Sequence, residues 1–151
     1  MDMGVYALQA ARLSTGLEPI SVTGQMFNSD PTVFEGVDET TSFQLEFPGK
    51  IMANCFASFG AGVNFLTVNA EKGEYGLRPF MNYNGLHGFL PRGETFDFPV
   101  MNQQAAQMDE MCLSIKEKRP SPTTGEEGLR DMIIIDAVRK SVSKDGKKIM
   151  L

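Results

Sequence analysis

The stretch 42–59 constrains the fold most, because apolar and polar residues alternate through two runs that are separated only by Pro48-Gly49-Lys50. A two-residue period is typical of a half-buried strand. A turn this short joins antiparallel neighbours, since a parallel crossover needs a dozen or more residues. The stretch therefore predicts an antiparallel hairpin. Its inward side chains are Phe43, Leu45 and Phe47 in the first run and Ile51, Ala53, Cys55, Ala57 and Phe59 in the second.

Further strands are predicted over 20–27, 63–70 and 75–83, the first of them at an edge of the sheet. Gly60-Ala61-Gly62 and Lys72-Gly73-Glu74 separate the later runs as turns or bulges. Residues 147–151 can add a short terminal strand. We expect one open, mainly antiparallel sheet of at least five strands. No period survives over 84–100, which predicts a long loop that holds His87 and Arg92.

Three helices are predicted around this sheet. The first covers 4–13 and ends near Ser14 or Thr15, since Gly16 follows, and Asp2 occupies its N-cap position. The second covers 102–117, and the third starts at a capping box that Thr124 forms with Glu127. Their expected core stripes are Val5, Leu8, Ala11 and Arg12, then Ala105, Met108, Met111, Cys112 and Ile115, then Leu129, Met132, Ile133 and Ala137. Ile134, Ile135 and Val138 widen the third stripe until most of that helix should be covered. The chain is thus expected to be a single α+β domain, 1–151, with helices on one face of the sheet.

The other face of the predicted sheet is polar but carries little charge. It combines Ser42, Gln44, Asn54, Ser58 and Asn64 with Met52 and Phe56. Two interpretations stand at this point. The face is either simply solvated, or it is a flat interface with another subunit, since Met52 and Phe56 would otherwise add to an exposed apolar patch.

Composition excludes several classes of protein. The formal net charge is -5 and Lys and Arg form no cluster, which argues against a nucleic-acid partner. No apolar run approaches the roughly 18 residues of a membrane span. Two cysteines cannot form a disulfide framework, and with one histidine they offer no closely spaced metal ligands, so no metal is expected. A chain of 151 residues is also too short for a two-domain nucleotide enzyme.

Gly60-Ala61-Gly62 does not make a dinucleotide fingerprint. Phe65 occupies the third glycine position and a strand follows, so no helix N-terminus is available for a pyrophosphate. We therefore expect no cofactor-binding residue in this chain. The only histidine, His87, has no nucleophile motif around it and is expected to be a loop residue that lines a pocket.

Asp2 and Tyr6 form the one constellation with catalytic potential. They lie four residues apart on the first helix, at its positive end. A phenol there could exchange a proton with a hydroxyl or carbonyl oxygen, as carbonyl-alcohol interconversion requires. It would need a nearby cation, because an unperturbed Tyr titrates near 10. The alternative is that Asp2 only caps the helix and Tyr6 only packs.

The run from Met1 to Ile20 resembles the start of the C-terminal domain in the glucose-fructose oxidoreductase / inositol dehydrogenase / MocA (Gfo/Idh/MocA) family. Its Asp-x-Gly-x-(His or Tyr) motif is matched by Asp2, Gly4 and Tyr6. Residues 102–111 and 125–137 resemble two late helices of that domain. Tyr6 and the 125–137 motif look most like the glucose-fructose oxidoreductase branch. The resemblance implies a dihydrodipicolinate-reductase-like C-terminal fold.

The resemblance also implies a role for the chain. It would be the substrate-binding and oligomerisation domain of an NAD- or NADP-dependent oxidoreductase for a sugar or polyol. Tyr6 and Asp2 would be its catalytic residues. The family's N-terminal Rossmann domain, whose Glu-Lys-Pro motif supplies a lysine, is absent. The chain then reads as an excised domain or a natural truncation, and we expect it alone to bind no NAD(P) and to be inactive.

Two further expectations concern partners and compartment. By resemblance the chain is a homo-oligomer through its sheet face, and the alternative function is a non-catalytic module that dimerises there. Free cysteines favour a reducing cytoplasm. The periplasm stays open, because relatives in the glucose-fructose oxidoreductase branch can carry export signals.

Overall fold

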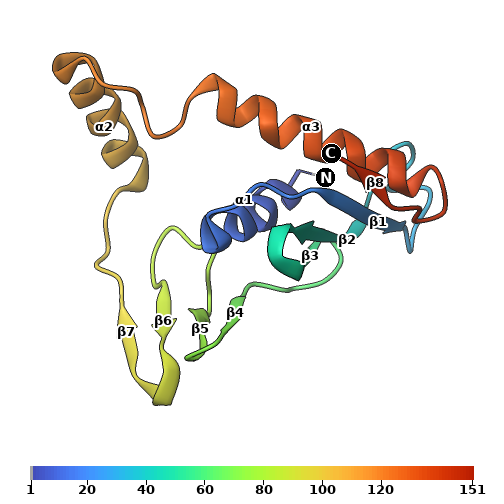
Figure 1. Cartoon of the computed structure of the whole chain (residues 1–151), viewed down its shortest axis with the longest axis horizontal. Coiled ribbons are helices and arrows are strands. Elements are labelled where there is room, and N and C mark those ends of the chain that lie inside the picture. The colour runs from blue at the N-terminus through green and yellow to red at the C-terminus, as the bar shows by residue number, and fades with distance from the viewer. Residues whose placement is uncertain (1) are drawn as a thin grey trace. The chain divides into compact units, whose positions relative to one another are not determined.

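The computed structural model describes residues 2–151 and has the predicted α+β composition (Figure 1). These residues divide into two compact units. The first unit holds the chain up to residue 63 together with 129–151, and the second holds 64–128. Each unit contains one four-stranded antiparallel sheet.

The sheet of the first unit has the order β3-β2-β1-β8. Its register pairs Val22 with Leu45 and Phe43 with Cys55, and Phe43, Leu45, Phe47 and Cys55 are buried as predicted. Ile51 and Phe59, which were expected on the same side, are exposed at 42% and 61%. The elements of this unit are α1 (Gly4–Thr15), β1 (Ser21–Phe27), β2 (Thr40–Phe47), the 3-10 turn η1 (Pro48–Lys50), β3 (Ile51–Ser58), residues 129–142 of α3 (Gly125–Val142) and β8 (Ile149–Met150).

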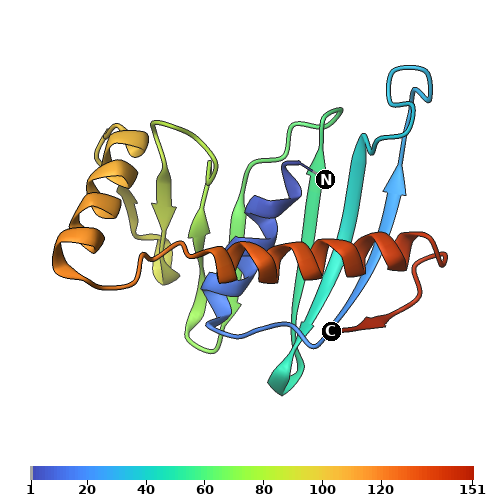
Figure 2. The same cartoon turned by 90° about the horizontal axis from the view of Figure 1, so that it is seen from above.

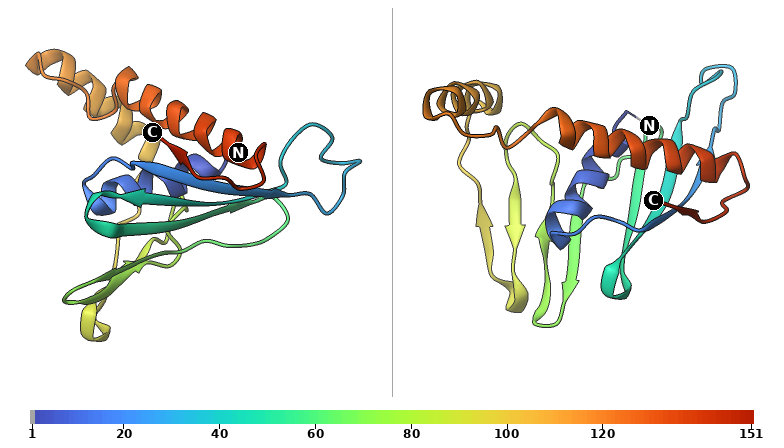
Figure 3. Two further views of the ribbon diagram at one scale, coloured as in Figure 1. Left: turned by 45° about the vertical axis from the view of Figure 1, so that its right-hand side comes forward. Right: turned by 45° about the horizontal axis from the view of Figure 1, so that its top comes forward.

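Helices cover the apolar face of this sheet. Figures 2 and 3 show α1 and the later turns of α3 on the same side of β1, β2 and β3. The contact is close at Gly24 in β1, where a Cβ would lie 2.8 Å from Cγ1 of Val138. The core between the layers contains Leu8, Ala11, Val22, Phe43, Leu45, Phe47, Cys55, Ile134, Ala137 and Val138.

The second unit has a sheet of order β4-β5-β6-β7. Its elements are β4 (Leu66–Ala70), β5 (Gly73–Leu77), β6 (His87–Phe89), the 3-10 turn η2 (Pro91–Gly93), β7 (Thr95–Asp97) and α2 (Gln103–Glu117). Every apolar side chain that is buried in the described residues belongs to the first unit, so this unit has no such core of its own.

The prediction of one continuous sheet is wrong, because no ladder joins β3 to β4. Just beyond the β2–β3 ladder, the N–H of Phe59, which follows β3, donates to the carbonyl of Glu39, which precedes β2. At Gly60 a Cβ would clash with the Glu39 carboxylate, and the chain then leaves the sheet. The edge position of β1 is also wrong, since β8 pairs with Ser21 and Val22.

The loop predicted over 84–100 contains the β6–β7 hairpin instead. Each of these strands has only three residues, too few to show a two-residue period. The strand predicted over 75–83 ends at Leu77. Pro79 follows shortly after and has no N–H to donate to a ladder.

The helix bounds agree with the sequence, but the predicted buried face is wrong for α2 and only partly right for α3. α1 ends at Thr15, followed by Gly16 in the left-handed region. The stripe expected to bury α2 is largely exposed, with Met108 at 68% and Ile115 at 67%. In α3, Leu129, Met132 and Ile133 are exposed. The side of α3 that is buried carries Asp131, Ile134, Ala137, Val138 and Ser141.

Candidate functional site

One exposed stripe runs along α1, and it includes the residue with the strongest catalytic potential. Asp2, Tyr6, Gln9 and Leu13 are exposed at a spacing of four, three and four residues, which places them on one side of the helix. Tyr6 is 50% exposed. The opposite side is buried through Leu8, Ala11 and Arg12, so the Tyr6 phenol is presented outward from the core.

Asp2 is not the N-cap that the sequence predicts. The cap is Met3, whose backbone is already helical (φ -74°, ψ -13°), and no side chain caps this end. The first turn closes when the Tyr6 N–H donates to the Met3 carbonyl over 3.3 Å. Asp2 therefore lies in a turn one residue earlier, exposed at the same end of the helix as Tyr6.

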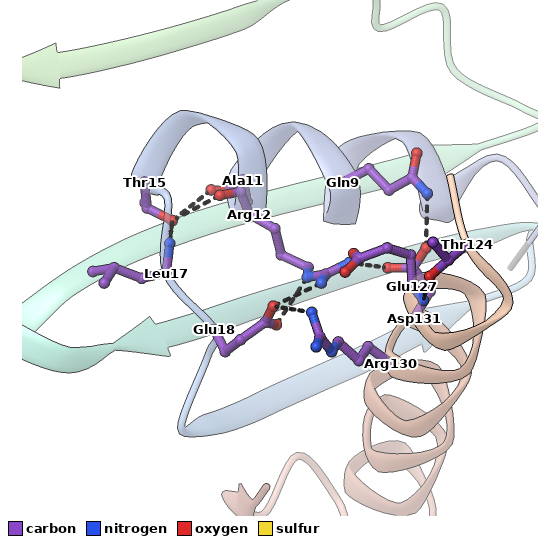
Figure 4. A network of polar contacts seen from close by, with 10 residues as sticks. All are labelled: Gln9, Ala11, Arg12, Thr15, Leu17, Glu18, Thr124, Glu127, Arg130 and Asp131. Atoms are coloured by element: carbon purple, nitrogen blue, oxygen red, sulfur yellow. Dashed lines mark hydrogen bonds and ion pairs between the residues drawn. The ribbon is translucent and has the colours of Figure 1, made fainter. Parts of the chain in front are cut away.

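Behind the exposed stripe, a buried ionic network fastens α1 to α3 (Figure 4). Arg12 is 9% exposed, and its Nη1 donates to Oδ1 of the buried Asp131 over 2.9 Å. Its Nε and Nη2 donate to the two carboxylate oxygens of Glu18 over 2.9 and 2.7 Å. Asp131 also accepts a bond from Nε2 of Gln9 over 2.7 Å. The bond from Arg12 holds the pKa of Glu18 below its usual range.

Sequence reasoning missed this network, although one residue pointed to it. Arg12 lies on the apolar stripe of α1, and an arginine is almost never fully buried without a partner. Its position therefore required a buried carboxylate. The sequence does not identify which carboxylate, because Asp131 is 119 residues away in the chain.

The open face of the first sheet has the polar character predicted for it. Ser42, Gln44, Asn54, Met52 and Phe56 all point away from the core, with Phe56 38% and Met52 45% exposed. Neighbouring polar side chains on this face form a hydrogen bond: Nε2 of Gln44 donates to Oδ1 of Asn54 over 2.8 Å. Glu46 and Lys148 form an ion pair near the β8 end of this sheet.

Asn64 does not belong to this face. Its Oδ1 accepts bonds from the backbone N–H groups of Phe80 and Met81, both over 2.9 Å, within the second unit. Its Nδ2 donates to the Met81 carbonyl over 3.2 Å. Asn64 therefore organises the segment that follows β5.

His87 lies in β6 rather than in a loop, and Nδ1 pairs with Oδ1 of Asp97 over 2.6 Å. It does not line two of the pockets in the second unit. The larger of these, about 440 Å³, is lined by Tyr83, Asn84, Val100, Met101, Asn102, Gln103 and Gln104. Arg92 lies in η2 with a positive φ of 77° and lines neither pocket.

The two cysteines differ in environment. Cys55 is buried against α1 as predicted, and burial raises the pKa of its thiol to about 12. Cys112 is exposed, contrary to its expected place on a core stripe. Among residues 2–151, no cluster of three His, Cys, Asp or Glu side chains could hold a metal ion. Within the same range, no helix is both long and apolar enough to cross a bilayer.

Comparisons with known proteins match this chain to one group of oxidoreductases. The family model of the GFO/IDH/MocA C-terminal domain matches residues 1–75. D-xylose 1-dehydrogenase [NADP(+)] from Haloarcula marismortui is 27% identical over 143 residues, which cover 91% of this chain and 40% of that protein.

Solved structures agree over nearly the whole chain. Aldose-aldose oxidoreductase from Caulobacter crescentus, complexed with glycerol, superposes with a TM-score of 0.88 at 28% identity, over 98% of this chain and 46% of that one. An oxidoreductase from Agrobacterium radiobacter, in complex with NAD+, L-tartaric acid and magnesium, shares the fold with a TM-score of 0.76 at 13% identity, over 97% of this chain and 47% of that one. The chain thus spans less than half the length of these relatives. Its residues 1–75 match the GFO/IDH/MocA C-terminal domain model, and the chain shares the fold of these oxidoreductases over nearly its whole length.

Proposed function

We propose that this chain is the substrate-binding and oligomerisation domain of an NAD(P)-dependent oxidoreductase that acts on a sugar or a related polyol. The observation that carries the proposal is the exposed Tyr6 on a firmly anchored α1, in a chain that matches an aldose-aldose oxidoreductase over 98% of its length. Two of the relatives named above are named for xylose and for aldoses, which suggests the substrate class.

The glycines at 60–62 do not fit the phosphate-binding turn of a nicotinamide site. Gly60-Ala61-Gly62 leads into an irregular segment and then β4, so the glycines precede no helix N-terminus that could receive a pyrophosphate. In this proposal NAD or NADP binds to a separate N-terminal Rossmann domain, which also supplies the cationic lysine. Hydride transfer is the chemistry that the cofactor supplies there. The present chain contributes substrate contacts and a proton.

Tyr6 is the proton donor or acceptor in this proposal. When the sugar is oxidised, its reacting hydroxyl gives a proton to the Tyr6 phenolate oxygen, and in the reverse direction the phenol returns that proton to the carbonyl oxygen. Asp2 lies at the same end of α1 and binds no helix N–H as a cap, so its carboxylate is available to orient Tyr6 or a substrate hydroxyl.

Replacing Tyr6 in the full-length protein tests this role. Tyr6→Phe removes only the hydroxyl, so kcat should fall by about 10²- to 10⁴-fold, while the dissociation constant of the nicotinamide stays nearly unchanged. Tyr83→Phe, at an exposed tyrosine of the second unit, is the matched control and should leave kcat unchanged. An unaltered rate for Tyr6→Phe would rule out the assigned role.

Whether the nicotinamide binds to a separate domain can be tested directly. Titration of this chain alone with NAD+ and NADP+, followed by fluorescence, should show no binding, and the coding sequence upstream of Met1 should encode a Rossmann domain. Nicotinamide binding to the isolated chain would contradict the proposal. The free cysteines fit a reducing compartment such as the cytoplasm.

A second candidate function, dimerisation through the open sheet face, is favoured by the side chains found there. Hydroxyl and amide groups surround the exposed Met52 and Phe56, and Gln44 and Asn54 already bond to each other. A partner can cover such a face without burying unpaired charges. Phe56→Lys should convert a dimer into a monomer in sedimentation velocity, whereas Val33→Lys, at an exposed loop position, should not. A monomeric unmodified protein would eliminate this candidate.

A further inference from the structure

Arg12 and Asp131 lie directly behind the exposed stripe of α1, and their geometry specifies how that helix is rotated. One carboxylate holds two residues of the same helix: Oδ1 binds Arg12 and Oδ2 binds Gln9. The two anchored residues are three positions apart, so a rotation or a slide of α1 would stretch at least one bond.

Both anchored residues lie to one side of Tyr6 around the helix. With about 100° per residue, Gln9 lies about 60° and Arg12 about 120° from Tyr6, in the same direction. Fixing these two angles fixes the direction in which the phenol projects. Arg12 is held from its other side by Glu18, just beyond the helix end, which prevents the guanidinium from moving with α1.

A purely stabilising role explains this arrangement poorly. Replacing a buried ion pair with apolar residues of similar volume is often neutral or stabilising, because burial removes both charges from water. Leu8 and Ala11 already provide apolar packing on the same helix. The Arg12–Asp131 pair is directional, so it adds to this packing a specific rotation of α1 about its axis.

We propose that Arg12 and Asp131 are positioning residues that aim Tyr6 at the substrate, a role that rests on the proposed function of Tyr6. Arg12 and Asp131 are both buried, so they act through the helix and not by contact with substrate. A displacement of about 1 Å at a catalytic group can lower a rate by about 100-fold.

A double-mutant cycle in the full-length protein separates positioning from stability. When Tyr6 is present, Arg12→Met should lower kcat by about 10- to 100-fold and change KM less. In the Tyr6→Phe background, Arg12→Met should lower kcat less than twofold. If Arg12→Met does not fold, Asp131→Asn serves in its place, because it keeps the side-chain volume and loses only the charge. The matched control is Arg119→Met, which removes an arginine paired with Glu110 and Glu117 and should leave kcat unchanged.

If Arg12→Met lowers kcat by the same factor with Tyr6 as with Tyr6→Phe, the proposal is overturned, since an effect on folding alone does not depend on the Tyr6 hydroxyl. Hydrogen exchange provides a readout that is independent of catalysis. Arg12→Met or Asp131→Asn should accelerate exchange of the α1 amides while those of β2 and β3 change little, and unchanged α1 exchange would also overturn it. If Tyr6→Phe has no effect on kcat while α1 exchange does respond, the assigned role of Tyr6 fails but the network is shown to fix the helix.

Discussion

At the scale of single residues, Cys55 and Cys112 should react very differently with thiol reagents. Burial raises the pKa of Cys55 to about 12, so almost none of it is thiolate at pH 8, and the buried sulfur is also inaccessible. Cys112 is exposed on α2. An aromatic disulfide reagent should therefore label one thiol in the folded chain and two after denaturation. Cys112→Ser should abolish the rapid phase, and rapid labelling of both thiols would contradict the structure.

The residues at the start of α1 show what a sequence reveals about a site. The exposure of Tyr6 is consistent with the helical period, because positions 2, 6, 9 and 13 share a side while Leu8 is buried. The N-cap could not be assigned in the same way. Asp2 and Met3 are adjacent, and the choice between them depends on backbone angles, which favoured Met3 even though Asp is the better capping residue type.

At the scale of elements, helix ends were predicted better than helix faces. Gly16 marks the end of α1, and the Thr124 hydroxyl accepts from the Glu127 N–H over 3.4 Å, as the capping box predicts. These signals are local. The buried face of α3 was assigned only in part: Ile134, Ala137 and Val138 are buried as predicted, but Asp131 was not expected on that side. A carboxylate suggests solvent exposure unless its distant partner, Arg12, is known.

The Arg12–Glu18 contact links the end of α1 to a pH-dependent part of the stability. Glu18 has a lowered pKa in the folded chain, chiefly because Arg12 donates to it, so folding favours its ionised form. Its contribution is complete above the usual carboxyl pKa of about 4.3 and is lost as the pH falls through the lower folded value. Urea unfolding should show the wild type more stable than Glu18→Gln at pH 7, with the difference shrinking below about pH 4.

The control for this measurement is Glu71→Gln, at an exposed position between β4 and β5. It should leave the wild-type stability nearly unchanged at both pH values. A Glu18→Gln difference that stays constant from pH 7 to pH 3 would show that the ion pair does not contribute in its charged form.

At the scale of the whole molecule, the α+β class and the antiparallel pairing were predicted, and the division into two sheets was not. Alternation is clear in β2 and β3, which have eight residues each. It is absent in β6 and β7, which have three. A sequence also does not show where a ladder stops. That point lies near Gly60, whose neighbour in space, Glu39, is 21 positions earlier in the chain.

The distribution of buried apolar side chains predicts unequal stability across the chain. All those in the described residues lie in the first unit, whereas the second unit is held by backbone ladders, polar contacts and ring contacts between residues that are not fully buried. Segments with little buried apolar surface open at lower free energy. Native-state hydrogen exchange should therefore give lower opening free energies for amides of 64–128 than for those of β1, β2 and β3. Equal protection in both units would contradict this expectation.

The close approach of Gly24 to Val138 has a consequence for how such a chain can diverge over evolution. A larger residue in β1 at that point requires a smaller one in α3, so the two positions should change together among homologues, although 114 residues separate them. Positions on the exposed side of α2 have no such neighbour to match. Substitutions should accumulate faster there than at positions 24 and 138.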